Sequence, residues 1–125
     1  MILPSELPSD IRRRVVQPPG LPDGDLGWSR DDALVVLESL EGSIVAVLQV
    51  DIYAMPFGQH EVIHTGRQAT FIHHVGELAI DFAVRSRRQA AELIAASAAD
   101  ELFVLYFSGQ DDAASAYGAP TAAAS

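Results

Sequence analysis

The chain of 125 residues is long enough for one domain with a hydrophobic core, and 49% of its residues are apolar. It contains no cysteine, which excludes disulfides and zinc–thiolate sites and suits a reducing compartment. Seventeen acidic residues stand against eight basic ones, all Arg, for a net charge of −9, which argues against a nucleic-acid partner because phosphate binding needs a basic surface.

No apolar run approaches the roughly 20 residues of a membrane-spanning helix. The N-terminus has prolines at positions 4 and 8 and lacks the apolar stretch of a signal peptide. We therefore expect neither a membrane nor a nucleic acid as partner.

The prolines and alanines divide the chain into three parts. Residues 1–24 hold five of the seven prolines, with one short helical stretch from Ser9. Residues 25–109 carry the regular patterns and a net charge of −7, from twelve acidic residues and five arginines. Residues 110–125 are rich in alanine without periodicity. We predict a single globular domain over 25–109, preceded by a proline-rich segment and followed by a disordered tail.

The first long helix is predicted from the stretch GWSRDDALVVLESLEG. Ser29 is a suitable N-cap, and Asp31 and Asp32 lie in the first turn, where the helix dipole favours negative charge. An apolar stripe follows with helical spacing, and Gly42 ends the helix in a left-handed conformation.

A strand is predicted for SIVAVLQVDIY. Its even-numbered residues, Ile44 to Ile52, are all apolar and predict one buried face. On the other face, the side chains become polar at Gln49, Asp51 and Tyr53. Because these three alternate along the strand, we expect them to point to the same side and to form part of a surface site.

The next segment contains all four histidines of the chain. Residues 59–74 read QHEVIHTGRQATFIHH, and Gly66-Arg67 suits a two-residue type II′ turn between two strands. This hairpin would place His60 opposite His73. A metal-dependent or hydrolytic enzyme using His60, His73 and Asp51 is therefore one hypothesis, although no known metal-binding or nucleophile motif is present.

A second long helix is predicted from Gly76 onwards, with Glu77 and Asp81 in its first turn and Asp81 paired with Arg85. Arg85, Arg87 and Arg88 are interpreted as a solvated basic face with local ion pairs. The apolar stretch ELFVLYF predicts a last, covered strand. The predicted order is α-β-β-β-α-β: a small α/β (α+β) domain with a mainly antiparallel sheet of about four strands and two long helices packed on it.

Two stretches of this chain, Gly27 to Tyr53 and Gly76 to Ile94, resemble immunity protein family forty of the bacterial polymorphic-toxin systems. The resemblance lies in Gly-Trp-Ser before an acidic helix start, in Asp51-Ile52-Tyr53 at the end of a strand, and in Gly76-Glu77 before a helix that contains Arg85-Ser86 and Ala90. Gln49-Val50 stands where the family usually has two glycines. RQATFIHH replaces the family's aromatic segment.

The resemblance implies a cytoplasmic immunity protein that binds and neutralises a cognate toxin domain, without enzymatic activity and without a cofactor. The acidic charge favours a basic toxin. The residues that we expect at the contact surface are Gln49, Asp51, Tyr53, His60, His64, His73 and Glu77. The alternatives are a self-associating structural or regulatory module, as a homodimer through the hairpin or the ELFVLYF strand, and the His/Asp metal-dependent enzyme.

Overall fold

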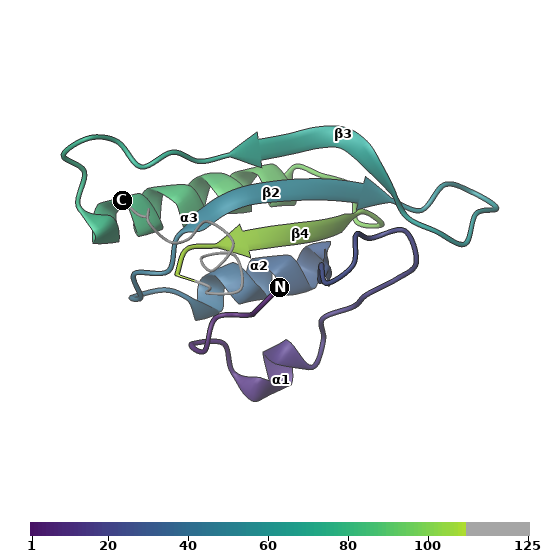
Figure 1. The fold of residues 1–125 in the computed structure, drawn as a ribbon, viewed down its shortest axis with the longest axis horizontal. Coiled ribbons are helices and arrows are strands. Elements are labelled where there is room, and N and C mark those ends of the chain that lie inside the picture. Colours follow the sequence, from purple (N-terminus) through teal and green to yellow (C-terminus); the bar gives the residue numbers. More distant parts are fainter. Residues whose placement is uncertain (110–125) are drawn as a thin grey trace.

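The computed structural model describes residues 1–109, and the predicted disordered tail at 110–125 lies outside them. Four strands form one antiparallel sheet in the order β1-β4-β2-β3. Figure 1 shows β4, β2 and β3 side by side. They are β1 (Trp28–Ser29), β2 (Val47–Ala54), β3 (Ile63–Thr70) and β4 (Leu102–Phe107). The helices are α1 (Ser9–Arg12), α2 (Arg30–Ser39) and α3 (Ala79–Ala95).

This architecture confirms the predicted fold class. The element order differs in detail, because β1 precedes the first long helix and only two strands separate α2 from α3. Strand β4 lies between β1 and β2, although the two residues of β1 pair only with Leu102 and Phe103 at its start. Within residues 1–109, no helix is long and apolar enough to cross a membrane.

The main hydrophobic core lies between one face of the sheet and helices α2 and α3. Val50 and Ile52 of β2 and Phe103 and Leu105 of β4 are completely buried there. The helices contribute the stripe of α2 and the inner side of α3, including Val36, Leu40, Ala90 and Ile94. Burial of this apolar surface is the main stabilising contribution to the fold.

Helix α2 begins and ends as its sequence predicts. The Ser29 hydroxyl accepts a hydrogen bond from the backbone N–H of Asp32 at 3.2 Å, which satisfies one of the free donors of the first turn. Gly42 adopts a φ of +83° after the last turn. Both signals act within a few residues, which is why the sequence alone reveals them.

A bulge in β2 changes the predicted burial of its first half. Between Val47 and Gln49 the register with β4 shifts, so that an extra residue, Leu48, is inserted. Val47 therefore shares the core with Val50, whereas Leu48 is 37% exposed and Ile44 is 65% exposed. The prediction that all even-numbered residues are buried is wrong for these two, because alternation is interrupted at the bulge.

The predicted tight turn at Gly66-Arg67 is also wrong. Residues 63–70 form one continuous strand, β3, that pairs with β2, with Tyr53 opposite His64 and Asp51 opposite Gln68. Three residues, Thr65 to Arg67, bulge opposite Ile52, where Gly66 has a φ of +87°. Gly66, which predicted a turn, therefore lies in a β-bulge. The loop that connects β2 and β3 is 55–62.

The N-terminal segment contributes to the domain. Leu7 and Ile11 belong to the main core, and Val16 forms an isolated antiparallel bridge with Gly27. Further along, the Pro19 carbonyl accepts a hydrogen bond from the Val62 N–H at 2.9 Å. The folded unit therefore includes part of residues 1–24, beyond the predicted boundary at residue 25.

Candidate partner-binding site

The sheet face that points away from α2 and α3 carries a group of polar and aromatic side chains. Strand β2 places Gln49, Asp51 and Tyr53 there, and the pairing with β4 places Tyr106 directly opposite Gln49. We call the following six residues the open-face cluster: Asp25, Gln49, Asp51, Tyr53, His64 and Tyr106. The predicted grouping of Gln49, Asp51 and Tyr53 is thus observed.

Two carboxylates in the cluster converge on one phenol. The Tyr106 hydroxyl lies 2.8 Å from Asp25 Oδ2 and 3.4 Å from Asp51 Oδ2. A hydroxyl has a single proton, so it donates fully to only one of them at a time. Asp51 accepts a second hydrogen bond, from Gln49 Nε2 at 2.7 Å, and Asp51 is only 7% exposed.

His64 completes the cluster from β3. Its ring meets that of Tyr53 edge to face at 5.0 Å, and its Nε2 lies 3.9 Å from Asp51 Oδ1. The Nδ1 atom accepts the backbone N–H of Gly66 at 2.8 Å, which assigns the proton of the neutral ring to Nε2. The protonated Nε2 is therefore the ring nitrogen 3.9 Å from the Asp51 carboxylate, which is beyond hydrogen-bond distance.

The negative charge of the cluster is not balanced by arginine. Among residues 1–109, no Arg lies within ion-pair distance of Asp25 or Asp51. Burial and the hydrogen bond to Asp25 raise the pKa of Tyr106, and burial and the charge of Asp51 raise the pKa of Tyr53. Both phenols stay neutral, so the carboxylates carry the charge of this face.

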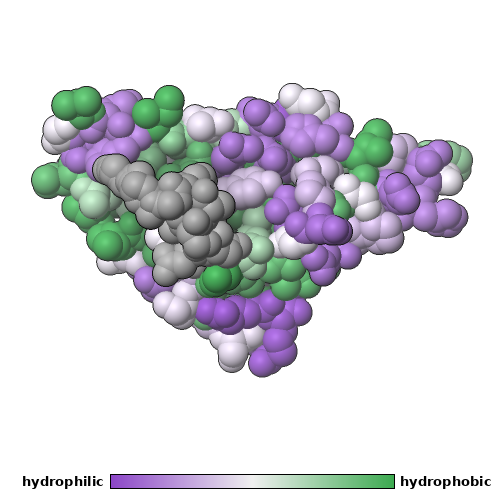
Figure 2. All heavy atoms as spheres, in the orientation of Figure 1, coloured by the Kyte–Doolittle hydropathy of each residue, from purple (hydrophilic) through white to green (hydrophobic). Residues whose placement is uncertain are grey.

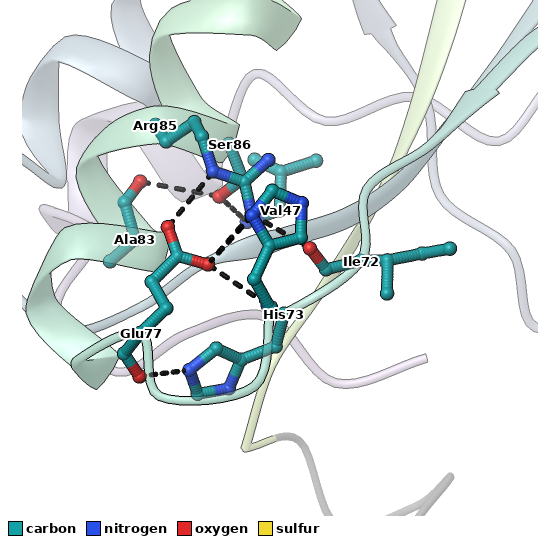
Figure 3. A network of polar contacts seen from close by, with 8 residues as sticks. Val47, Ile72, His73, Glu77, Ala83, Arg85 and Ser86 are labelled. Atoms are coloured by element: carbon teal, nitrogen blue, oxygen red, sulfur yellow. Dashed lines mark hydrogen bonds and ion pairs between the residues drawn. The ribbon is translucent and has the colours of Figure 1, made fainter.

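A second polar network organises the loop between β3 and α3 (Figure 3). The Glu77 carboxylate accepts hydrogen bonds from Arg85 Nε at 2.9 Å and from Arg85 Nη2 at 2.8 Å. It also accepts the backbone N–H of His74, while Arg85 donates to the carbonyl of Ile72. The hydrogen bonds from Arg85, and after them the one from the His74 N–H, lower the pKa of Glu77 to about 2.

The same network corrects two details of the predicted second helix. Arg85 pairs with Glu77 and not with Asp81, and Glu77 precedes the helix, which starts at Ala79. The basic face is likewise not uniformly solvated. Arg87 is only 6% exposed and donates to the carbonyls of Ser43 and Val45 at 2.9 and 2.7 Å.

The β3–α3 loop presents apolar side chains to solvent. Ile72, Val75 and Leu78 are 69%, 106% and 64% exposed. Beside them, the ring of His73 stacks on Phe82 with centroids 4.9 Å apart, and its Nε2 lies 2.6 Å from the Glu77 carbonyl oxygen. Figure 2 shows apolar atoms gathered at this end of the molecule, whereas β3 and the loop at the other end are mainly hydrophilic.

The seven predicted contact residues are divided among three places. Gln49, Asp51, Tyr53 and His64 meet in the open-face cluster, while His73 and Glu77 belong to the β3–α3 loop. His60 lies exposed in the β2–β3 loop and makes no hydrogen bond or ion pair with any of residues 1–109.

The predicted His60–His73 pair does not form, because β3 pairs with β2 instead of folding back on itself. Over residues 1–109, no group of three His, Asp or Glu side chains is placed to hold a metal ion. The constellation proposed for the metal-dependent enzyme is therefore not assembled.

Asp25 and Tyr106 are the members of the cluster that sequence reasoning missed. Tyr106 alternates with the buried Leu105 and Phe107, so the two-residue period of a strand could have placed it beside Gln49 and Asp51. Asp25 lies outside the predicted strands, 26 residues before Asp51 in the sequence. No local pattern indicates that its side chain reaches the sheet.

No protein-family model, curated protein or solved structure matches this chain. The chemistry of the open-face cluster and of the β3–α3 loop therefore has to support any functional assignment.

Proposed function

We propose that this chain is a cytoplasmic immunity protein that binds a cognate, basic toxin domain and blocks its active site or surface. The observation that carries the proposal is the pair of carboxylates, Asp25 and Asp51, that share one tyrosine hydroxyl without an arginine partner. A guanidinium or ammonium group from a partner would bind to this pair of carboxylates.

The surroundings of this pair support recognition of a protein. Tyrosine and histidine at an interface provide stacking area and hydrogen bonds, and protein-binding hot spots are rich in aromatic residues. Hydrogen bonds from Gln49 and Tyr106 hold Asp51 in place, so little conformational entropy is lost when a cation binds. The exposed apolar side chains of the β3–α3 loop offer a second, non-polar contact area.

The test is capture of the partner with tagged protein from the source organism, read by mass spectrometry, followed by toxicity and binding assays with the identified partner. We expect one stoichiometric, basic partner that is toxic alone and is neutralised by the wild type. The double variant Asp25→Asn/Asp51→Asn should bind at least roughly tenfold more weakly, since removing charges from a desolvated contact costs about 2 kcal/mol or more.

Glu92→Gln/Asp100→Asn is the matched control, because it removes two negative charges from exposed residues outside the open-face cluster and should leave toxin binding unchanged. A partner that is harmless by itself would contradict the immunity function. Equal weakening by both double variants would refute the open-face cluster as the contact site while leaving the function standing.

A further expectation concerns the rate of association. The net charge of −9 should steer a basic partner, so the association rate should fall steeply as ionic strength rises above about 0.15 M, where the Debye length is about 8 Å. Stopped-flow measurements at several salt concentrations test this. A rate independent of salt would contradict steering, though not binding.

A further inference from the structure

A groove of about 770 Å³ runs between α2 and α3, on the molecule's helical side. Its lining is mostly apolar and includes Leu34, Val35, Val84 and Ala91. Val84 is 47% exposed, and the other three are half-buried, so this lining is not fully covered within one chain. Ile80, 38% exposed one turn before Val84, extends the same outer stripe of α3.

The two walls of the groove carry opposite charges, and they are close enough for the charge of Glu41 to act on Arg87. Glu38 and Glu41, at the end of α2, form one wall, and Arg87 and Arg88 of α3 form the other. Glu38, Glu41 and Arg88 are exposed and form no ion pair with any of residues 1–109. Arg87 is occupied with the carbonyls of Ser43 and Val45, so Arg88 is the cation of this wall that remains available.

We propose that this groove is the interface of a symmetric homodimer, with a second copy of the chain as its occupant. A two-fold axis along the groove brings α2 of one protomer over α3 of the other. Rotation about this axis does not change a residue's position along it. Glu38 and Glu41 then face the Arg88 of the second copy, twice per dimer. The charge pattern is therefore complementary to itself, as a symmetric interface requires.

The apolar linings of the two grooves meet in the centre of this dimer. The four helices form a layer between two sheets, and the exposed stripe of α3 is removed from water. The open-face cluster lies on the other side of each sheet, away from this interface. The dimer is thus independent of the proposed function, and either can fail without the other.

The test uses the full chain in sedimentation-velocity experiments over a range of concentrations. We expect a species of twice the 13.4 kDa chain mass for the wild type. Glu38→Arg/Glu41→Arg and Arg88→Glu should each raise the self-dissociation constant roughly tenfold or more, because like charges then face one another. Arg13→Glu, an exposed change on the N-terminal segment, is the control and should remain dimeric.

Mixing the two charge-reversed variants provides the decisive readout. In the mixed dimer, arginines at 38 and 41 face a glutamate at 88, and the second contact keeps its natural pair, so the dimer should return. Circular dichroism checks that each variant is folded. A wild type that stays at the monomer mass up to about 1 mM, or a mixture that stays monomeric, would overturn the proposal.

Discussion

A side chain of α3 forms a hydrogen bond with the backbone at the beginning of β2, where the neighbouring strands supply no acceptor. The Ser86 hydroxyl accepts the N–H of Val47 at 3.0 Å and donates to the carbonyl of Ala83 at 3.2 Å. Ser86 is completely buried. One hydroxyl on α3 therefore provides the acceptor for a backbone donor next to the β2 bulge.

The Ser86→Ala substitution should lower the free energy of unfolding by about 1–3 kcal/mol, because the Val47 N–H would be left buried without an acceptor. Ser39→Ala is the matched control. The Ser39 hydroxyl donates only to the Val35 carbonyl one turn back in α2, so its loss should change stability by about 0.5 kcal/mol or less. Urea denaturation measures both, and equal effects would contradict the role given to Ser86.

The Glu77 carboxylate should titrate with a pKa of about 2, well below its ordinary value of 4.5, because Arg85 and the His74 N–H stabilise the charged form. A lowered pKa in the folded state means that the contribution to stability is complete above the ordinary pKa and is lost as pH falls towards 2. Carbon-detected NMR of the side-chain carboxyl measures the midpoint. In Arg85→Gln the midpoint should rise towards 4.5, and a midpoint near 4.5 in the wild type would contradict the network.

Among the elements, β3 departs most from its sequence pattern. Its bulge is held by side chains of the strand itself: Thr65 donates to the Ile52 carbonyl and accepts the N–H of Arg67, and His64 accepts the N–H of Gly66. The bulge thus satisfies two backbone donors of an edge strand locally. Such an arrangement disfavours pairing with a strand from another chain.

The bulge requires a left-handed residue at position 66. Gly66→Ala should cost about 1–2 kcal/mol of stability, because φ is +87° while a Cβ would meet no atom within 4 Å, so the loss comes from the backbone alone. Gly66→Asn should cost less, since asparagine tolerates this conformation better. Thermal denaturation of the two variants compares them, and an Ala variant as stable as the wild type would contradict the strained bulge.

The molecule as a whole is completed by its N-terminal segment. Ile11 is 6% exposed within the main core, and the Met1 amino group donates to the Gly24 carbonyl at 2.9 Å. Met1 and Leu21 also pack against the second face of the sheet, around Tyr53 and Val104. Residues 1–24 therefore contact both sides of the folded unit.

Ile11→Ala should destabilise the protein by about 2–5 kcal/mol, the usual cost of removing a buried branched side chain. Ile2→Ala makes the same chemical change in the same segment. Because Ile2 is 48% exposed, its replacement should cost about 1 kcal/mol or less. Chemical denaturation distinguishes the two, and similar small losses would show that the segment does not contribute to the core.

The fold class, helix α2 with its cap and stop, strand β4, and the shared face of Gln49, Asp51 and Tyr53 could all be predicted from the sequence. Their signals are local, because capping acts within one turn and strand alternation within a few residues. Part of the candidate site was therefore visible before the structure was known.

Only the tertiary structure placed β3 beside β2, inserted the bulge at Leu48, paired Arg85 with Glu77 and brought Asp25 and Tyr106 to Asp51. Each of these depends on a choice among competing partners. Gly66 suits a turn or a bulge, and Arg85 has two carboxylates before it in the sequence, Glu77 and Asp81. Packing between segments distant in the chain made those choices, since it buries the most apolar surface while leaving the buried backbone groups hydrogen-bonded.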